Sequence, residues 1–355
     1  MRIVVTGASG NVGSALLRRL VGDGDHDVVG LVRRVPDGGA PFGSVRWHSV
    51  DLTAPGAAAP LTTAVAGADA VVHLAWGFQP SHDPAYLEEL GVGGTARVLD
   101  AVASAGVPHL VHMSSVGAYS PRRDDRPVDE TWPTRGVASS PYSRHKAAAE
   151  RLLDRHEAAH PGRLVTRLRP GIVGQHDAGS ALLRYGLPAV VPAGLLRHLP
   201  LLPLDRRLVV PMVHADDVAD AIVRVLARRV PGAFNLAADP AVTTAAIAGA
   251  LAARSVHVPA GLVRVAVSAA WHARLQPVDP GWLDLAMSVP LLDTGRAVDE
   301  LGWRPRVDGL SVLAETLAGM AAAASGPSAV LRPRTVPGAL RRALRAGSVS
   351  GRRRP

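Results

Sequence analysis

The sequence contains no cysteine, which excludes disulfide bonds and thiolate metal sites and makes a reducing compartment unremarkable. It also lacks a long uninterrupted apolar run, because its most apolar late segment, residues 186–204, is broken by Pro188, Pro192, Arg197 and Pro200. No membrane span is therefore predicted. A core strand is expected to begin at Arg2 with no basic region before a longer apolar stretch, so no signal peptide is predicted. We expect a cytoplasmic protein.

Acidic residues are missing from residues 326–355, which contain eight arginines. Without these eight charges the net charge of +9 falls to about +1, so the basicity of the chain belongs to this tail. Its Pro, Gly, Ser and Arg content predicts a disordered appendage that cannot fold alone. The alternative is an arm for acidic partners or anionic lipid, helped by the pairs Ala339–Leu340 and Ala343–Leu344. No specific nucleic-acid partner is expected.

Apolar strand-like runs alternate with helical segments through the first half of this 355-residue chain. The expected strands are 3–6, 28–32, 45–47, 70–75, 110–114 and 164–168, and the expected helices are 12–21, 61–66, 84–105 and 141–159. Continuous apolar strands separated by helices predict a parallel sheet that is buried on both faces. We predict an α/β fold with a Rossmann-type doubly wound parallel sheet and a small C-terminal substrate lobe.

After Arg169 this alternation degrades, and it returns with a helix near 216–228 and a strand near 233–236. We therefore assign residues 1–170 and 212–238 to the domain that contains this sheet. Residues 171–211 and 239–325 are assigned to the substrate lobe, and 239–325 is expected to be irregular apart from a final helix at 310–323. Ligands of such sheets bind at the carboxyl ends of the strands, where this lobe would sit.

Residues Thr6–Gly13 follow the first apolar strand and open the first helical pattern. Gly7 permits a sharp turn, Gly10 permits phosphates to approach the backbone, and Gly13 permits close packing of helix on strand. The unpaired amides at the start of the helix then face an anion. An ordinary tight turn is the alternative, but the strand–turn–helix context favours a dinucleotide site.

Tyr142 and Lys146 stand four residues apart at the start of a predicted helix and therefore share one face. A phenol is a poor proton donor or acceptor at neutral pH unless positive charge stabilises its phenolate. An ammonium and an oxidised nicotinamide nearby would lower the pKa of Tyr142. Surface packing is the alternative for an isolated pair of this kind. The preceding Ser114–Ser115 at a strand end and the glycine turn favour the catalytic interpretation.

With its motifs in this order, the chain resembles the extended short-chain dehydrogenase/reductase family, which includes the nucleotide-sugar epimerases and dehydratases. The likeness extends over about residues 1–325 and rests on several motifs together. These are Thr6–Gly13, Asp51–Leu52, His73–Ala75, Ser114–Ser115, Tyr142 with Lys146, Arg169–Pro170, Val213–Val218 and Leu301–Pro305.

The resemblance implies an NAD(P)-dependent oxidoreductase in which Tyr142 is the general acid/base. Lys146 would hold the nicotinamide ribose and lower the pKa of Tyr142, and Ser115 would hydrogen-bond the substrate oxygen. Asp51 would accept from the adenine amino group, with Leu52 against the ring. The implied cofactor-binding set is Gly7, Ser9, Gly10, Asn11, Val12, Gly13, Arg33, Asp51, Leu52, Leu74, Ala75, Tyr142, Lys146 and Val173. The family often dimerises through the helices near 84–105 and 141–159, so a homodimer is implied.

The choice of cofactor depends on the end of the second strand, where an acidic side chain would bind the adenosine ribose and favour NAD. Here Val32 holds that position and is followed by Arg33 and Arg34. A guanidinium suits a phosphate, and no acid stands nearby to repel one. We predict NADP(H), with Arg33 on the 2′-phosphate and assistance from Ser9. NAD is the alternative if both arginines are merely solvated.

Three departures from the family concern the substrate. Gly91 replaces an Asn that family members often carry in the helix after the fourth strand, which weakens the case for an Asn-assisted proton relay. The segment after Arg169–Pro170 lacks the usual Asn, and Val209–Met212 lacks an Arg for the diphosphate of a sugar nucleotide. Arg206 or Arg207 would have to serve instead. A buried diphosphate needs its charge matched, so these departures disfavour a sugar nucleotide.

The insertions 182–204 and 258–285 are rich in Leu, Val, Ala and Trp, which suits an apolar substrate, although lobe packing is the alternative. Trp76 and Phe78 follow the fourth strand and are placed to contact the substrate. We predict an NADP(H)-dependent oxidoreductase that transfers hydride to or from a carbonyl or alcohol carbon of a small, largely apolar metabolite. The alternatives are an NAD-dependent nucleotide-sugar epimerase or dehydratase, and a non-catalytic dinucleotide-binding protein.

Three strand-associated histidines, His73, His112 and His214, are the remaining candidates for metal ligands. Their spacing does not suit a metal site. We expect them to hydrogen-bond to the backbone, and no metal is predicted.

Overall fold

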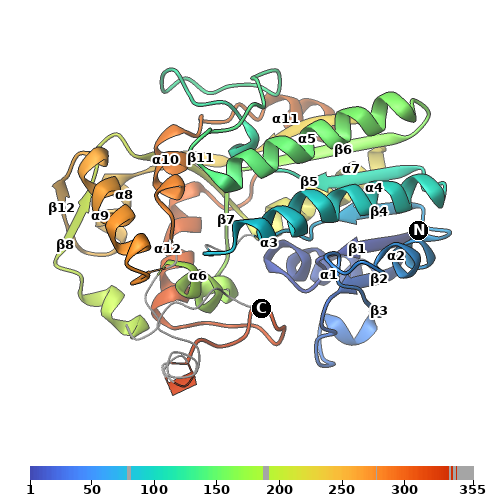
Figure 1. Cartoon of the computed structure of the whole chain (residues 1–355), viewed down its shortest axis with the longest axis horizontal. Coiled ribbons are helices and arrows are strands. Elements are labelled where there is room, and N and C mark those ends of the chain that lie inside the picture. The colour runs from blue at the N-terminus through green and yellow to red at the C-terminus, as the bar shows by residue number, and fades with distance from the viewer. Residues whose placement is uncertain (78–80, 187–191, 277, 336, 339–340, 342–355) are drawn as a thin grey trace.

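The computed structural model describes residues 1–77, 81–186, 192–276, 278–335, 337–338 and 341. Phe78 and the pairs Ala339–Leu340 and Ala343–Leu344 lie outside these residues. Figure 1 shows a body of layered strands and helices joined to a smaller lobe.

The body is built on a seven-stranded parallel sheet of order β3-β2-β1-β4-β5-β6-β10. Val4 in β1, an inner strand of the sheet, lies between Val29 and Val71 of its two neighbours, and all three are buried. The direction of strand order reverses between β1 and β4, which places a ligand crevice at their carboxyl ends. The predicted doubly wound parallel sheet is confirmed. Its strands are β1 (Arg2–Thr6), β2 (Asp27–Val32), β3 (Arg46–Ser49), β4 (Ala70–His73), β5 (His109–Met113), β6 (Leu164–Pro170) and β10 (Gly232–Leu236).

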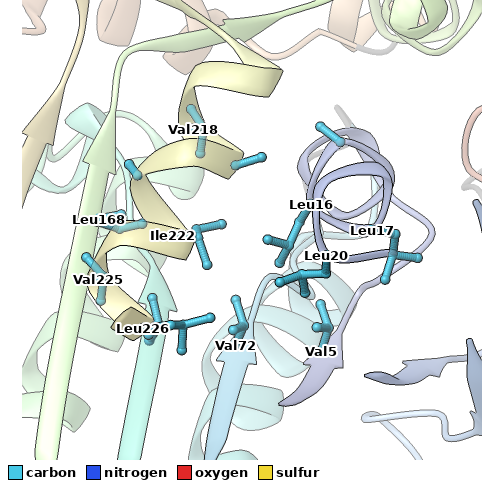
Figure 2. Packing of buried hydrophobic residues seen from close by; sticks show 14 of the residues in the cluster. Val5, Leu16, Leu17, Leu20, Val72, Leu168, Val218, Ile222, Val225 and Leu226 are labelled. Carbon is cyan, nitrogen blue, oxygen red and sulfur yellow. The ribbon is translucent and has the colours of Figure 1, made fainter. Parts of the chain in front are cut away.

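Helices cover both faces of this sheet. One face carries α1 (Asn11–Asp23), α7 (Ala215–Arg228) and α11 (Gly295–Leu301), and the other carries α2 (Ala58–Val65), α4 (Gly94–Ser104) and α5 (Pro141–Ala159). Figure 2 shows Leu16 and Leu20 of α1 with Ile222 of α7, packed over Val5 and Val72 of the sheet. Burial of each such side chain contributes about 1.5–3 kcal/mol, so α1 is held firmly behind β1.

The helix predicted over residues 84–105 is interrupted in the structure. It consists of α3 (Pro84–Glu88), a π-helical turn at Glu89–Gly93, and then α4. The apolar spacing continues through the turn, so periodicity alone does not reveal it. Short π-helical segments inside helices often lie at functional sites.

The smaller lobe is more regular than the sequence predicts. It contains a sheet of order β11-β9-β7 and a parallel pair of strands, β8 and β12. The expectation of an irregular 239–325 is wrong. The elements β12, α8 and α10 have four to nine residues, which are too few for a clear periodic pattern, and the 13 residues of α9 include a single arginine, so its apolar residues show no contrasting polar face. None of the described helices is both long and apolar enough to cross a membrane. The lobe elements are β7 (Ile172–Gly174), α6 (Gly179–Gly186), β8 (Leu201–Leu204), β9 (Val209–His214), β11 (Ala238–Thr243), α8 (Thr244–Ala250), β12 (Arg254–His257), α9 (Ala260–His272), α10 (Pro280–Ser288) and α12 (Gly309–Ala321).

The tail predicted to be disordered from Gly326 begins with a packed segment, residues 326–335, which we call the C-terminal strap. Ser328 Oγ donates to the carbonyl oxygen of Ser9 at 2.7 Å, and Leu331 is buried. The backbone N–H of Arg334 donates to Ser180 Oγ at 3.2 Å. The prediction is wrong for this segment because average composition does not reveal the partners that single side chains find on the body.

Substitution of two glycines in α1 tests the close approach of this helix to the turn. A Cβ at Gly13 would lie 2.4 Å from the carbonyl oxygen of Gly7, whereas a Cβ at Gly22 meets nothing within 4 Å. We expect Gly13→Ala to destabilise the protein by about 1–3 kcal/mol through overpacking, and Gly22→Ala to be neutral or slightly stabilising. Urea unfolding midpoints measure both changes, and equal midpoints would contradict the close approach.

Candidate functional site

The turn between β1 and α1 leaves backbone amides open. Gly10 occupies the N-cap position with no side-chain cap, and its N–H donates to the carbonyl oxygen of Gly7 at 2.9 Å. Gly7 has a φ of 69°, and a Cβ there would lie 2.7 Å from the backbone nitrogen of Ala75. The first amides of α1 therefore face outward from a surface that side chains do not fill, which fits the phosphates of a dinucleotide.

These amides border a cavity of about 480 Å³ formed with residues of the lobe. The structure brings every predicted site residue to the lining of this one cavity. They are Gly7, Ser9, Gly10, Asn11, Val12, Gly13, Arg33, Asp51, Leu52, Leu74, Ala75, Ser115, Tyr142, Lys146 and Val173. Residues from six separate strand ends and turns thus meet at one edge of the sheet.

Tyr142 lies in the first turn of α5, which begins with Ser140 as N-cap and Pro141 at the first helical position. Ser115 caps a short 3₁₀ turn after β5, and its Oγ accepts from the N–H of Gly117 at 3.0 Å. The side chains of Ser115 and Tyr142 both line the cavity, and the Ser115 hydroxyl is close enough to act on the pKa of Tyr142. The two predicted hydroxyl groups therefore lie together at the cavity.

Ser143, which the sequence patterns do not single out, joins the two elements that carry this pair. Its Oγ donates to the carbonyl oxygen of Gly117 at 2.6 Å and accepts from the N–H of Val137 at 2.7 Å. The side chain is fully buried. It fixes the start of α5 against the turn of Ser115. The serine beside Tyr142 is visible in the sequence, but its partner 26 residues away is not.

Lys146 is the only lysine in the sequence. Its Nζ donates to the carbonyl oxygen of Met113 at 2.8 Å and lies 3.6 Å from the ring centroid of Trp76. Burial lowers the pKa of Lys146 to about 7, and the carboxylate of Glu150 opposes this. Arginine cannot release its proton in this way, so a solitary lysine among many arginines is a signal of function in the composition itself.

Tyr142 is enclosed by aromatic rings. The ring centroids of Trp282 and Trp76 lie 4.9 Å and 6.3 Å from that of Tyr142. Burial raises the pKa of Tyr142 to about 12, and the hydrogen bond with Ser115 opposes this. The family resemblance implies instead that Lys146 lowers the pKa of Tyr142. In the structure burial dominates, so a lower pKa requires further positive charge at the site.

A buried carboxylate supports this part of α5. Glu150, one turn beyond Lys146, accepts from Ser114 Oγ at 2.6 Å, from Arg169 Nε at 2.9 Å and from a terminal nitrogen of Arg167 at 3.1 Å. Burial tends to raise the pKa of Glu150, but the two arginines hold it below its usual value. Two arginines alternating with apolar residues in a buried strand are a sequence signal for such a partner.

The two arginines after β2 differ in position. Arg33 lines the cavity and donates to the hydroxyl of Tyr86 at 2.7 Å. Arg34 is exposed and is not among the described residues that line the cavity. On the next strand end, Asp51 accepts from the N–H of Thr53 at 3.0 Å and from its hydroxyl at 2.7 Å. Arg33 is thus the guanidinium placed to meet a ligand.

Gly91 and Trp76, noted separately in the sequence, are neighbours in the structure. A Cβ at Gly91 would lie 2.9 Å from the indole ring of Trp76. The absence of a side chain at residue 91 therefore makes room for the ring that covers Lys146.

The lobe side of the cavity is apolar. Among the described lining residues, charge is carried by Arg33, Asp51 and Lys146, all of which belong to the body. Arg207 is bound to Asp205 at 2.9 Å, and neither it nor Arg206 lines the cavity. Neither is therefore placed to hold a diphosphate there. The lobe and strap contribute Ala178, Ala181, Leu182, Tyr185, Val210, Trp282, Leu285, Ala286, Val289, Val330 and Leu331.

The three candidate histidines have different surroundings. His73 is hydrogen-bonded to the hydroxyls of Thr6 and Thr95, and burial lowers its pKa to about 3. His112 is buried, with no partner for either ring nitrogen among the described residues. The expected backbone bonds are therefore wrong for these two, whereas His214 accepts from the N–H of Asp216 at 3.2 Å. The described residues include no group of three or more metal-ligating side chains.

Comparison with known proteins supports the motifs. A model of the NAD dependent epimerase/dehydratase family matches residues 3–237. A UDP-glucose 4-epimerase of Mycolicibacterium smegmatis is 29% identical over 332 residues, which cover 89% of this chain and 97% of that protein. A decarboxylating sterol-4-alpha-carboxylate 3-dehydrogenase of Saccharomyces cerevisiae is 33% identical over 138 residues, 38% of each chain.

Longer relatives and solved structures extend the comparison. Uncharacterized proteins of Mycobacterium tuberculosis and Mycobacterium bovis are 29% identical over 307 residues, which cover 86% of this chain. The matched region spans only 28% of the length of those proteins. The crystal structure of Thermus thermophilus UDP-glucose 4-epimerase in complex with NAD has a TM-score of 0.67 and 25% identity, covering 90% of this chain and 99% of that one.

Because Lys146 is the only lysine in the sequence, its titration can be measured without signals from other lysines. Because its pKa falls from 10.5 to about 7 on folding, the folded protein binds fewer protons than the unfolded chain between these values. We expect the free energy of unfolding to rise with pH across this window by several kcal/mol, relative to Lys146→Met. Urea unfolding at pH 7 and pH 10 measures the difference. The ε-¹⁵N resonance of the lysine should titrate near pH 7, and a titration near 10.5 would contradict the burial described here.

Proposed function

The chain belongs to the NAD-dependent epimerase/dehydratase family, and from this premise we propose that it is an NADP(H)-dependent oxidoreductase. Its substrate would be a small, largely apolar metabolite, oxidised or reduced at a carbonyl or alcohol carbon. The observation that carries the proposal is the position of Ser115, Tyr142 and Lys146 on a cavity whose lobe side has no charged residue among those described. A sugar-nucleotide diphosphate would be desolvated against that wall without matching charge.

Each of the three polar residues has a distinct task in this proposal. Lys146 would hold the nicotinamide ribose, since its Nζ lies at the base of the cavity beside Met113. Ser115 would hydrogen-bond the substrate oxygen, and Tyr142 would exchange a proton at that oxygen. With a pKa of about 12, Tyr142 is the neutral phenol that carbonyl reduction requires. A bound nicotinamide supplies the hydride chemistry.

A preference for NADP(H) forms the finer part of the proposal. Arg33 lines the cavity at the end of β2, and one of its nitrogens already donates to Tyr86, which orients the guanidinium. A guanidinium with its planar set of N–H donors suits a 2′-phosphate. The related Thermus structure is a complex with NAD, so the preference has to come from this chain's own arginine.

A second candidate function is a nucleotide-sugar 4-epimerase. It is favoured by the Mycolicibacterium relative, a UDP-glucose 4-epimerase that aligns over 97% of its length. Interconversion of UDP-glucose and UDP-galactose, with no net change in dinucleotide absorbance at 340 nm, would establish this second function and refute an apolar substrate.

Substitution of the phenol tests the chemistry. We expect Tyr142→Phe to lower turnover by about 10²–10⁴-fold, because it removes the proton donor, while dinucleotide affinity changes little. Turnover is followed at 340 nm against a panel of apolar ketones and alcohols, and affinity by calorimetry. Tyr185→Phe, which alters another tyrosine of the cavity lining, serves as the matched control. An unchanged rate in Tyr142→Phe, or no turnover by the unaltered protein despite dinucleotide binding, would overturn the proposal.

Paired titrations with NADPH and NADH test the role of Arg33. We expect NADPH to bind at least tenfold more tightly, or about 1.4 kcal/mol, and Arg33→Ser to remove most of this difference. Arg34→Ser is the matched control, because Arg34 is exposed and should leave the preference intact. Equal affinities in the unaltered protein would show that NAD is the cofactor.

A further inference from the structure

Exposed apolar side chains gather at the far end of the lobe. Of the eleven large hydrophobic residues that are exposed in the described part of the chain, six lie between residues 195 and 275. They are Leu195, Leu201, Val256, Leu262, Val265 and Leu275. Figure 1 shows β8, β12 and α9, which carry four of them, together at one end of the molecule. Single exposed apolar residues are ordinary, but a gathered set marks a contact surface.

The outer face of α9 is the centre of this surface. Leu262 and Val265 are 64% and 67% exposed, and Ala266 and Ala269 continue the exposed stripe at helical spacing. None of the residues of α9 is buried. Its inner face packs against α10, to which it is joined by the pair Arg264–Asp284 at 2.9 Å. We call Leu262, Val265, Ala266 and Ala269 the α9 stripe.

The helix beneath α9 belongs to the cavity wall. Trp282 and Leu285 of α10 line the cavity, so α9 forms the outer layer of the same wall. In the last turn of α9, the ring of Trp271 stacks on the ring of His82, with 4.5 Å between the two centroids. The exposed apolar stripe is thus one helix away from an apolar cavity.

The segment that carries the stripe has charged residues of a single sign. The sequence has no acidic residue from Pro240 to Val278, but it has three arginines there. Arg264 is paired with Asp284, whereas Arg254 and Arg274 are exposed and form no ion pair with any residue that the structure describes. Arg254 precedes α9 in the sequence and Arg274 follows it, so exposed positive charge stands on both sides of the stripe along the chain. Exposed apolar side chains combined with basic residues are features of helices that lie in a membrane interface.

Charge also distinguishes among the possible binding partners of this surface, which are a second copy of the chain, nucleic acid and lipid. A two-fold dimer through the stripe would set the arginines of one copy against those of the other, with no acidic residue of this segment to pair them. Nucleic acid would satisfy the arginines but not Leu262 and Val265. Anionic lipid can contact both kinds of side chain, because the apolar side chains can be buried among acyl chains while the guanidinium groups pair with anionic headgroups.

We propose that the α9 stripe, flanked by Arg254 and Arg274, docks this protein on the surface of an anionic lipid membrane. The helix lies in the plane of the interface and does not span the bilayer. Docking brings the outer wall of the cavity to the lipid surface. The proposed docking depends only on the α9 stripe and the two arginines, so it does not require the proposed reaction to be correct.

Sedimentation of the full chain with vesicles tests this proposal. Vesicles of phosphatidylcholine alone are compared with vesicles that contain 30% phosphatidylglycerol, at about 100 mM salt. We expect binding to the anionic vesicles to be at least tenfold stronger, because the arginines add attraction to the insertion of the stripe.

Two variants separate the stripe from other contacts. Leu262→Gln with Val265→Gln should lower the partition coefficient on anionic vesicles at least tenfold, whereas Leu310→Gln, an exposed leucine of α12, should not change it. Arg254→Gln with Arg274→Gln should weaken binding to anionic vesicles and leave the weak binding to neutral vesicles unchanged. All four altered side chains of these two variants are exposed, so folding is expected to be intact, and thermal unfolding checks this.

Three outcomes would overturn the proposal. One is the absence of sedimentation with either vesicle. Another is unchanged binding of the Leu262→Gln/Val265→Gln variant, which would assign lipid binding to the arginines of residues 341–354 instead. The third is a concentration-dependent dimer, measured by light scattering, that this variant abolishes, since the stripe would then be an interface between two copies. Turnover of a water-soluble ketone in each variant keeps these outcomes separate from the proposed reaction.

Discussion

The buried carboxylate of Glu150 is the constraint on which the site depends. It joins α5 to Ser114 at the end of β5 and to Arg167 and Arg169 of β6. A shift of α5 along the sheet would leave a buried charge unpaired, at a cost of about 3–5 kcal/mol. Lys146 stands one turn before this anchor. The position of the lysine is therefore set by charge pairing inside the protein before any ligand is considered.

The sequence predicts the body of the molecule well because its signals are local. Continuous apolar runs identify β1, β2, β4 and β5, and a glycine turn with a following amphipathic helix identifies α1. No comparable pattern marks β8, which contains a proline, or β12, which has one apolar residue among four. Ser143 and Glu150 are not predicted because their structural roles depend on hydrogen bonds to partners 26 and 36 residues away. The cavity lining on the body side follows from motifs, whereas the Ser328 contact with Ser9 spans nearly the whole chain and has no local signature.

One departure from the family pattern, at Gly91, is coupled in three dimensions to the position of Trp76. Gly91 stands where relatives often carry Asn, and the space beside it is filled by the indole of Trp76. That ring covers the ammonium of Lys146 and meets the edge of Tyr142. A polar group that could pass protons is thereby exchanged for an apolar cover over the cation. The same exchange of polar for apolar surface continues along Trp282 and Leu285 on the lobe side.

The C-terminal strap joins two segments that are far apart in the sequence. Ser328 is bound to the glycine turn at Ser9, 319 positions earlier, and Val330 and Leu331 form part of the cavity lining. During synthesis, β1 and the glycine turn leave the ribosome first, yet their cavity lacks one wall until the strap emerges. A chain halted before residue 328 would hold a folded sheet with an open-sided pocket. Synthesis through Leu331 is thus required before Val330 and Leu331 can line the cavity.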